Sequence, residues 1–427
     1  MTPEIYIDSL TRLPNRALFE DRVKQAVAQA RRSNEQIAIH YFELDNLKGL
    51  LETHGKRISE GLIKGVADRI HSFIRKSDTF SRLEGGEFAI IQRGVGNSMG
   101  VTTLVQKVLH ALEDPFVVDG REIRTSVSVG ISLLSPDVEP REIMAQAEHA
   151  LHMAKEKSHQ DFRFHDAAVD EAVQAMVVLR KQLESAIENE EFFLEYQPQV
   201  DLSQNRIIAA EALIRWRHPE RGVLGPDVFI PVAEDGGLIV PLGQWVLEEA
   251  CRQRQAWNEA GLKDIPIAVN VSGVQFQDPG FPDRVIRILE TTQLGPDALD
   301  LEFTESVLLR SSEELKGSLA QLADHGVKFS LDDFGTGYSS LRSLRAFPVQ
   351  KLKIAGEFVR DMISSPDAAS IVEAVIGLGH MLDLKVVAEE VETEQQLEFL
   401  RNHHCDAAQG YLLGRPEAAG DFAKRLT

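Results

Sequence analysis

From residue 192 onward the sequence repeats one pattern, a short apolar run followed by a helix-like stretch, and this repeat limits the folds open to the chain. The runs are FFLEYQPQV, IIAAEALIRW, IPIAVNVS, LDLEFTES, VKFSLDDF, QKLKIA, LKVVAEEV and AAQGYLLG. The first two are joined only by DLSQNR, which predicts an antiparallel hairpin. Most of the others alternate with helices, as strands of a parallel sheet with covered faces do. Eight strands over about 235 residues predict a TIM-like (β/α)8 barrel with one antiparallel strand.

The first part of the chain predicts a separate α/β domain, because 427 residues are too many for one ordinary core. Amphipathic helical stretches such as NRALFEDRVKQAVAQARRS alternate with strand-like runs such as QIAIHYFELD, and TFSRLEGGEFAIIQR reads as a β-hairpin turning at Gly85-Gly86. An Ala-rich stretch without glycine or proline follows. The predicted domains are therefore 1–165 and 181–427, with a helical connector at 166–180.

The composition excludes several classes of protein. A formal charge of −20 argues against nucleic-acid binding by charge alone. Cys251 and Cys405 lie far apart, outside any CxxC pattern, which favours reduced thiols and a cytoplasmic location. No apolar run is long enough to span a membrane and the first residues do not read as a signal peptide, so we expect no direct membrane contact by this chain.

Polar side chains recur late in the predicted barrel strands. Burying an unpaired carboxylate costs considerable free energy, so their presence there indicates a specific role. In a parallel barrel these strand ends converge on one face, where such enzymes keep their active sites. A set of oxygen ligands without His or Cys favours Mg²⁺ or Mn²⁺. Two such ions suit the hydrolysis of a phosphodiester, and Lys353 could hold the phosphate or the attacking water. A competing interpretation is that the paired aspartates only cap a helix through GTGYSS. The residues are Glu211, Asn270, Glu302, Asp332, Asp333, Lys353, Glu389 and Gln409.

Residues 181–427 resemble the EAL family of cyclic di-GMP phosphodiesterases. The motifs that carry the resemblance are, in order, EALIRW, NVS, EFTES, DDFGTGYSS, KLKIA, VAEEVE and QGYLLGRP. The family cuts one ester bond of cyclic di-GMP to give linear pGpG, uses two Mg²⁺ or Mn²⁺ ions, and commonly works as a dimer. The resemblance therefore implies such an activity here, and a homodimer formed through the EAL domain.

The resemblance also implies roles for individual residues. One metal would be held by Glu211, Asn270, Glu302 and Asp332, and the second by Asp332, Asp333 and Glu389. Lys353, Asp333 and Glu389 would form the catalytic set, with Lys353 acting on the water or the phosphate. The dinucleotide pocket would be shaped by Gln197, Leu213, Arg215 and Gln409. A loop over residues 334–340 would couple dimer contacts to the metals, anchored by Glu392.

Two positions depart from the family pattern. Ala355 stands where the family usually has Asp, and Glu390 stands where it usually has Gly. Neither change removes a metal ligand or Lys353, so we expect reduced activity or tighter regulation rather than loss. The alternative is a receptor that binds cyclic di-GMP without cutting it and signals through domain rearrangement.

Residues 8–165 resemble the GGDEF family of diguanylate cyclases, starting with DSLTRLPNR, which implies an α/β fold around a mostly antiparallel sheet. In the signature, Glu84 replaces the first glycine and Gly86 a metal-binding acid. Glu43 stands in for the other metal-binding Asp, while Leu51 and Glu60 occupy the guanine-reading positions. We therefore expect an intact hairpin without cyclase activity. A weaker hypothesis, that this domain binds GTP and activates the second, is disfavoured by the apolar Leu51.

One feature of the cyclase family remains in RKSD. Arg75 and Asp78 match its RxxD inhibitory site at the expected distance before the signature, and Arg75 could pair with a guanine or phosphate of cyclic di-GMP. The favoured alternative is a structural Arg–Asp pair that joins the hairpin to the preceding helix.

Overall fold

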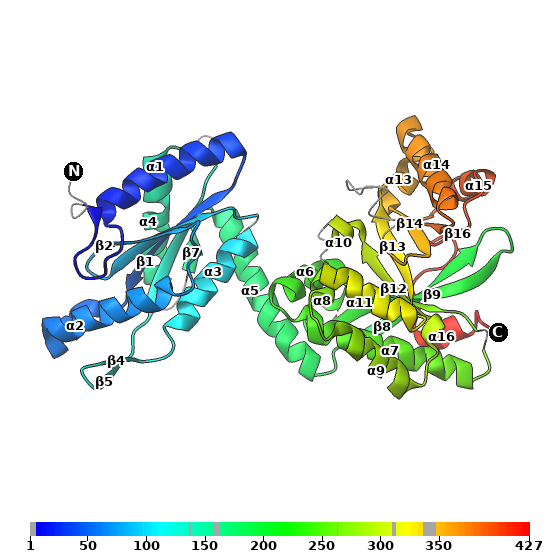
Figure 1. Ribbon diagram of the computed structural model, residues 1–427, viewed down its shortest axis with the longest axis horizontal. Coiled ribbons are helices and arrows are strands. Elements are labelled where there is room, and N and C mark those ends of the chain that lie inside the picture. Colours follow the sequence, from blue (N-terminus) through cyan, green and yellow to red (C-terminus); the bar gives the residue numbers. More distant parts are fainter. Residues whose placement is uncertain are drawn as a thin grey trace. The chain divides into compact units, whose positions relative to one another are not determined.

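A computed structural model describes residues 6–96, 98–135, 138–157, 162–262, 264–309, 313–335 and 347–427 of the chain. Its internal contacts divide it into two compact units, residues 1–178 and 179–427. Figure 1 shows an α/β sheet in the first unit and a closed barrel surrounded by helices in the second. Within the described residues, no helix is both long and apolar enough to cross a membrane.

The first unit is built on a five-stranded sheet in the order β2-β3-β1-β6-β7. Its strands are β1 (Ile37–Leu44), β2 (Thr79–Glu84), β3 (Glu87–Arg93), β6 (Val127–Leu133) and β7 (Phe162–Phe164). All neighbouring pairs are antiparallel except β6 and β7, which confirms the mostly antiparallel sheet. A separate two-stranded ribbon joins β4 (Phe116–Val118) and β5 (Arg121–Ile123).

Both faces of this sheet are buried, so its central strands are apolar on both sides. On one face, α1 (Arg16–Ser33) and α4 (Pro140–Lys157) pack Phe19, Val23 and Ile143 against β1 and β3. On the other face, α2 (Leu47–His71) and α3 (Ser98–Ala111) enclose a core that contains Phe42 and Phe88. The helix α5 (Ala167–Glu188) adds Val173 to this second core and continues past the boundary between the units, so the predicted connector 166–180 falls largely within it.

The hairpin predicted around the Gly85-Gly86 turn is confirmed, because β2 and β3 pair up to Glu84 and Glu87 on either side of it. The commonest two-residue turn of this kind has positive φ at both central residues. Gly85 has φ +51°, but Gly86 is not among the residues with positive φ. The turn therefore needs glycine for its backbone at the first position only.

The second unit contains the predicted barrel of eight strands, closed by pairing of the first strand with the second and the last. Seven strands run parallel, and β8 is antiparallel to both of its neighbours, β9 and β16. A ninth strand, β10 (Gly222–Leu224), extends the sheet beyond β9. The barrel strands are β8 (Phe192–Asp201), β9 (Arg206–His218), β11 (Ile267–Asn270), β12 (Leu299–Thr304), β13 (Lys328–Phe334), β14 (Lys351–Ile354), β15 (Lys385–Ala388) and β16 (Ala407–Ala408).

Helices connect the parallel strands and cover the outside of the barrel (Figure 1). Their amphipathic faces bury residues such as Phe229, Leu242 and Val372 against the strands. The described helices are α6 (Pro226–Asp235), α7 (Ile239–Glu259), α8 (Gly273–Phe276), α9 (Phe281–Thr292), the 3-10 turn η2 (Pro296–Ala298), α10 (Glu305–Leu309), α11 (Glu313–Asp324), α13 (Gly356–Asp361), α14 (Pro366–Met381), α15 (Glu394–Asn402) and α16 (Ala419–Ala423).

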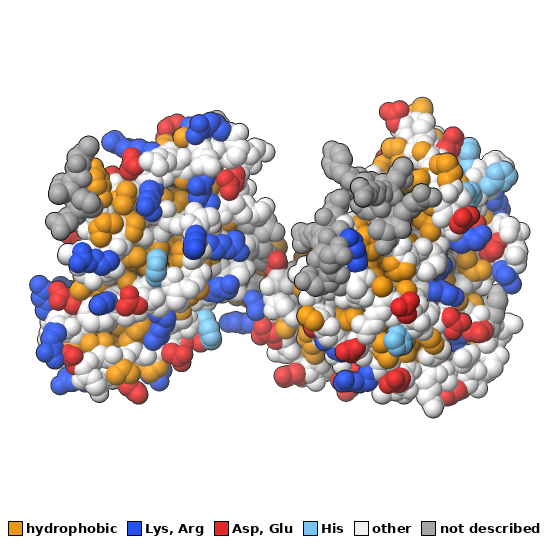
Figure 2. Space-filling view, viewed as in Figure 1, with side chains coloured by type: hydrophobic (Ala, Val, Ile, Leu, Met, Phe, Trp, Pro, Cys, Tyr) orange, Lys and Arg blue, Asp and Glu red, His pale blue; other side chains and the backbone are white. Residues whose placement is uncertain are grey.

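The acidic charge of the chain is concentrated in the barrel unit. Residues 1–178 hold 22 basic and 26 acidic residues, whereas residues 179–427 hold 24 basic and 40 acidic ones. On the face drawn in Figure 2, acidic and basic side chains are interspersed over the first unit, as on an ordinary solvated surface. Most of the excess negative charge therefore lies in the barrel unit.

Candidate functional site

One end of the barrel gathers the polar side chains predicted from the strand ends. Pairing of the parallel strands places Asn270 beside Glu302, and Asp332 beside Thr304. Lys353 lies in β14, while Glu389 and Gln409 directly follow β15 and β16. The shared direction of these strands thus brings residues as far apart in sequence as Asn270 and Gln409 to one face.

Lys353 is the centre of this cluster. Its side chain is only 1% exposed, and its ammonium nitrogen lies 2.6 Å from Glu302 Oε2 and 2.7 Å from Glu389 Oε1. Asp332 Oδ1 and Glu211 Oε2 lie 3.3 and 3.4 Å from the same nitrogen. Carboxylates from β9, β12 and β13 and from the end of β15 therefore share one buried cation.

The cluster holds one cation and four carboxylates, and burial together with this imbalance of charge shifts the pKa values of its members. Burial by itself would lower the pKa of Lys353, but the four surrounding carboxylates raise it well above its usual value. Burial and the neighbouring Glu211 raise the pKa of Glu302 to about 8, although Lys353 opposes the shift. Burial likewise raises the pKa of Glu389 well above its usual value. These carboxylates thus favour the cationic form of Lys353, but its single positive charge does not balance the four carboxylates around it.

Amide side chains hold Glu211 from the other side. Asn270 Nδ2 donates to Glu211 Oε1 at 2.6 Å, and Gln409 Nε2 donates to Glu211 Oε2 at 2.6 Å. Gln409 Nε2 also donates to Gln197 Oε1 at 2.9 Å, while Gln197 Nε2 donates to the carbonyl of Gly414. Gln197 and Gln409, predicted to contact substrate, therefore also fix the orientation of a predicted metal ligand.

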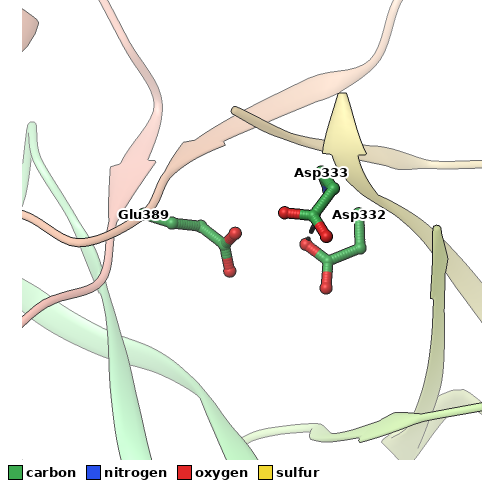
Figure 3. A group of neighbouring side chains, drawn as sticks. All are labelled: Asp332, Asp333 and Glu389. Atoms are coloured by element: carbon green, nitrogen blue, oxygen red, sulfur yellow. Dashed lines mark hydrogen bonds between the residues drawn. The ribbon is translucent and has the colours of Figure 1, made fainter. Parts of the chain in front are cut away.

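A second group of carboxylates lies beside Lys353. Asp332, Asp333 and Glu389 each offer an oxygen within 4.8 Å of the others. Figure 3 shows Glu389 pointing toward the two aspartates, which end β13. Asp333 adopts φ +53°, a conformation that few residues with a β-carbon adopt, and its N–H donates to Asp332 Oδ1 at 3.0 Å. Burial and then Asp332 raise the pKa of Asp333.

The donor set fits a hard divalent cation. All the candidate ligand atoms are carboxylate oxygens or the amide oxygen of Asn270, whose nitrogen is turned to Glu211. Oxygen donors of this kind select Mg²⁺ or Mn²⁺. Positive charge would also relieve the imbalance that raises the pKa of Glu302 and Asp333. The residues could therefore hold the implied metal.

A cavity of about 920 Å³ adjoins this cluster. Asn270 and Glu302 are among its lining residues, and Leu213, Ile230 and Phe303 contribute apolar walls. The other three residues predicted for the pocket, Gln197, Arg215 and Gln409, are not among the lining residues. Arg215 instead pairs with Glu195 Oε2 at 2.8 Å. A cavity of this size with apolar walls and a few polar groups is typical of a small-molecule site.

The two departures from the family pattern lie around the start of α13. Ala355 is 2% exposed and directly precedes that helix. Glu390 follows the candidate ligand Glu389, adopts φ +52°, and pairs with Arg360 of α13. Neither change displaces a carboxylate from the cluster around Lys353.

Two buried residues that sequence analysis did not select also support the site. Glu305 is 4% exposed and accepts from the N–H of Gly335 at 3.3 Å, and Gln199 Nε2 donates to Glu302 Oε1 at 3.1 Å. The motif LEFTES places Glu305 three residues after Glu302, which could have indicated it. Nothing separated Gln199 from an ordinary strand residue.

The predicted loop 334–340 lies outside the described residues beyond Gly335. Its proposed anchor, Glu392, is exposed, and the N–H of Glu392 donates to Gln396 Oε1 at 2.8 Å. In the part of the loop that the structure describes, the carboxylate that holds the backbone is that of Glu305.

In the first unit the residues at the cyclase signature are paired with cations of the chain. Glu43 Oε2 accepts from Lys155 at 2.7 Å, and Glu87 Oε2 accepts from Arg16 at 3.2 Å. Leu51 is 45% exposed. Glu60, at the other guanine-reading position, lies 3.5 Å from Lys56 on the surface of α2.

Asp78 of the predicted inhibitory site is used structurally. Its Oδ1 accepts from the N–H of Arg93 at 3.1 Å and so ties the turn after α2 to the end of β3. Arg75 contributes its carbonyl to the N–H of Asp78, while its side chain is exposed. The expected Arg75–Asp78 ion pair is not found between these two described residues.

Comparison with known families gives two matches. Residues 180–416 match the EAL domain family, and residues 5–161 match the diguanylate cyclase, GGDEF domain family. The chain is 40% identical over 413 residues to the bifunctional diguanylate cyclase/cyclic di-GMP phosphodiesterase MucR of Pseudomonas aeruginosa, covering 96% of this chain and 60% of that protein. It is 36% identical over 410 residues to the cyclic di-GMP phosphodiesterase NbdA of the same organism, covering 96% and 52%. The chain thus spans little more than half the length of these relatives.

Solved structures support the same families. The P. aeruginosa MucR phosphodiesterase in complex with c-di-GMP is 45% identical, with a TM-score of 0.56, over 57% of this chain and 99% of that one. The EAL enzyme Bd1971 in its cAMP- and cyclic di-GMP-bound form is 26% identical, with a TM-score of 0.59, over 72% and 82%. Vibrio cholerae LapD, 19% identical over 96% of both chains with a TM-score of 0.51, supports the tandem fold alone.

Proposed function

Because the chain belongs to the EAL domain family and carries a GGDEF domain before it, we propose that it is a metal-dependent phosphodiesterase that hydrolyses cyclic di-GMP to linear pGpG. The observation that carries the proposal is the convergence of carboxylates from four strands on buried Lys353, beside a large cavity. We assign the GGDEF domain to 1–165, the connector to 166–180 and the EAL domain to 181–427. A cytoplasmic homodimer formed through the EAL domain is part of the proposal.

In this function Glu211, Asn270, Glu302 and Asp332 would hold one Mg²⁺ or Mn²⁺ ion, and Asp332, Asp333 and Glu389 the other. Two such ions would activate water and neutralise charge that develops on the phosphate. In the metal-free protein the surrounding carboxylates raise the pKa of Lys353, which favours an ammonium over a general base. As an ammonium it donates hydrogen bonds that hold a phosphate oxygen or orient the water. The cavity beside Asn270 would take a guanine base against Leu213.

The GGDEF domain would have a regulatory role without making cyclic di-GMP. MucR is described as bifunctional, so the relatives do not decide this question. Two observations support a domain without cyclase activity. Gly86 has no carboxylate to bind a metal, and the apolar Leu51 cannot hydrogen-bond a guanine base. In addition, Glu43 and Glu87 pair with Lys155 and Arg16.

The test is chromatography of cyclic di-GMP after incubation with the purified chain and Mg²⁺ or Mn²⁺, beside Glu211→Ala. We expect pGpG with the parent, and a loss of at least about 10³-fold with the variant, because a bound metal supplies several kcal/mol of stabilisation. Arg252→Ala, at an exposed residue of α7 that does not line the cavity, controls for a general loss of folding.

A non-catalytic receptor is the second candidate, and the presence of Ala355 and Glu390 beside the cluster favours it. Equilibrium dialysis of cyclic di-GMP in the same samples separates the two functions. Tight binding with no pGpG would establish the receptor. Neither binding nor turnover would contradict both candidates.

A further inference from the structure

The short helix α13 contacts residues on both sides of the second group of carboxylates. Its residue Phe358 lies against Gly335, just past Asp332 and Asp333, where a β-carbon would approach the ring to 3.0 Å. Its first residue, Gly356, lies under the side chain of Glu390, so that a β-carbon at 356 would overlap that side chain. The helix thus touches the segment after β13 and the segment after β15.

Glu390 has an unfavourable backbone conformation. Its φ of +52° is one that glycine adopts freely and residues with a β-carbon adopt at a cost. It directly follows Glu389, whose carboxylate lies 2.7 Å from Lys353 and within reach of Asp332 and Asp333. A change in the backbone at Glu390 would therefore move a candidate metal ligand.

Arg360 pairs with the side chain of Glu390. It lies one helical turn after Gly356, and its guanidinium pairs with the carboxylate of Glu390, which lies over Gly356. The same pair turns the negative charge of Glu390 toward α13, although Glu390 still contributes to the raised pKa of Asp333. On the other side of α13, the Val359 carbonyl accepts from Gln396 Nε2 at 3.2 Å, which joins the helix to α15.

We propose that Arg360 is a positioning residue: it holds Glu390 in the left-handed conformation and thereby fixes Glu389 for the second metal ion. The Arg360–Glu390 pair would thus stabilise a left-handed backbone conformation that glycine at position 390 would adopt without a side-chain contact. The inference rests on the proposed function, because it concerns the second ion of that site.

The test is a double-mutant cycle read by Mn²⁺ binding, with isothermal titration calorimetry on the full chain and no substrate present. We expect Arg360→Ala to weaken the lower-affinity ion about tenfold and to leave the other ion unchanged, as loss of a residue that orients a ligand does. Glu390→Gly should bind both ions like the parent, because glycine keeps the conformation without help. The double variant should also match the parent, because no strained residue remains to be held. Arg360→Lys should keep part of the affinity.

Arg252→Ala is the matched control. Arg252 is 63% exposed, as Arg360 is, and pairs with Glu249 on α7, far in sequence from the metal ligands. The inference is overturned if Arg360→Ala binds Mn²⁺ like Arg252→Ala, or if the double variant is as weak as Arg360→Ala. It is also overturned if the parent binds fewer than two ions. A parent that binds two ions and makes no pGpG would contradict the proposed phosphodiesterase alone, and the cycle would still be decisive.

Discussion

The two acidic clusters of this chain differ in how their charge is balanced. In the GGDEF domain, Glu43 and Glu87 each pair with a cation of their own, and both remain partly open to solvent, at 33% and 40% exposure. In the EAL domain, buried Lys353 is shared by Glu211, Glu302, Asp332 and Glu389. A divalent cation would have to displace a lysine or arginine from the first cluster, whereas it would supply charge that the second lacks. The family resemblance is similar in both domains. Burial and Glu43 raise the pKa of Glu87 despite Arg16, so the first cluster also has some excess of negative charge. The excess is more concentrated in the second cluster, where four carboxylates share one buried cation.

Among the variants that keep every candidate metal ligand, the largest expected effect comes from removing the shared cation. We expect Lys353→Met to lower kcat/KM for cyclic di-GMP by about 10²–10³-fold, because the donor that faces the phosphate or water is lost. Steady-state chromatography of pGpG at saturating Mn²⁺ measures it.

Lys351→Met is the control within the same strand. Lys351 lies two residues earlier and pairs with fully buried Asp300 at 2.6 Å. Each substitution leaves buried carboxylates without their cation and should lower the free energy of unfolding by about 3–5 kcal/mol. Equal losses of turnover in the two variants would show that Lys353 acts only through stability.

The charge deficit also predicts a pH dependence in the metal-free protein. Burial raises the pKa of Glu302 to about 8, so between its unfolded value of 4.5 and about 8 the folded state binds more protons than the unfolded state. The free energy of unfolding should therefore fall as pH rises through this window, by about 1–3 kcal/mol between pH 5 and 8. Urea denaturation in EDTA measures it.

Two comparisons sharpen this prediction. Buried His40, whose pKa is lowered to about 4, gives the opposite slope below pH 6.5, so the quantity to follow is the difference between the parent and Glu302→Gln at each pH. Saturating Mn²⁺ should abolish the fall in the parent and add about 3 kcal/mol at a hundredfold excess over Kd. A difference that stays flat from pH 5 to 8 would mean that Glu302 is ionised without a metal.

A smaller effect distinguishes the two candidate anchors of the loop after β13. Glu305→Gln should lower turnover about tenfold, because a backbone N–H bonded to a carboxylate contributes about 1.5 kcal/mol. Glu392→Gln should stay within about twofold, because Glu392 is exposed. The same pGpG assay measures both variants. The reverse order would support Glu392 as the anchor that the family resemblance implies.

The sequence allowed prediction of the barrel and of its converging strand ends for a physical reason. Strand periodicity and connection length fix which end of each strand faces the site, so Glu211, Asn270 and Glu302 could be assigned together. The partners of individual side chains could not be predicted. That Gln409 would hold Glu211, or that Arg360 would pair with Glu390, depends on rotamers and on contacts between distant segments. The positive φ at Glu390 could not be predicted either. A residue with a β-carbon rarely adopts this conformation, which glycine adopts freely.

The smallest expected effect lies in the GGDEF hairpin, where Gly86→Asp restores the acid that the cyclase signature has. A β-carbon at 86 would approach Leu47 Cδ2 to 2.7 Å, so that flexible side chain must move, at a cost of about 1 kcal/mol in thermal unfolding. We expect no cyclic di-GMP from GTP in the parent or in this variant, because Glu84 still occupies the phosphate turn and Leu51 the base-reading position. The assay belongs in a Glu211→Ala background, where the product would not be consumed. Synthesis by the variant alone would mean that the missing acid was the whole defect, whereas synthesis by the parent would mean that paired Glu43 and Glu87 still admit a metal, which would remove the contrast between the two clusters.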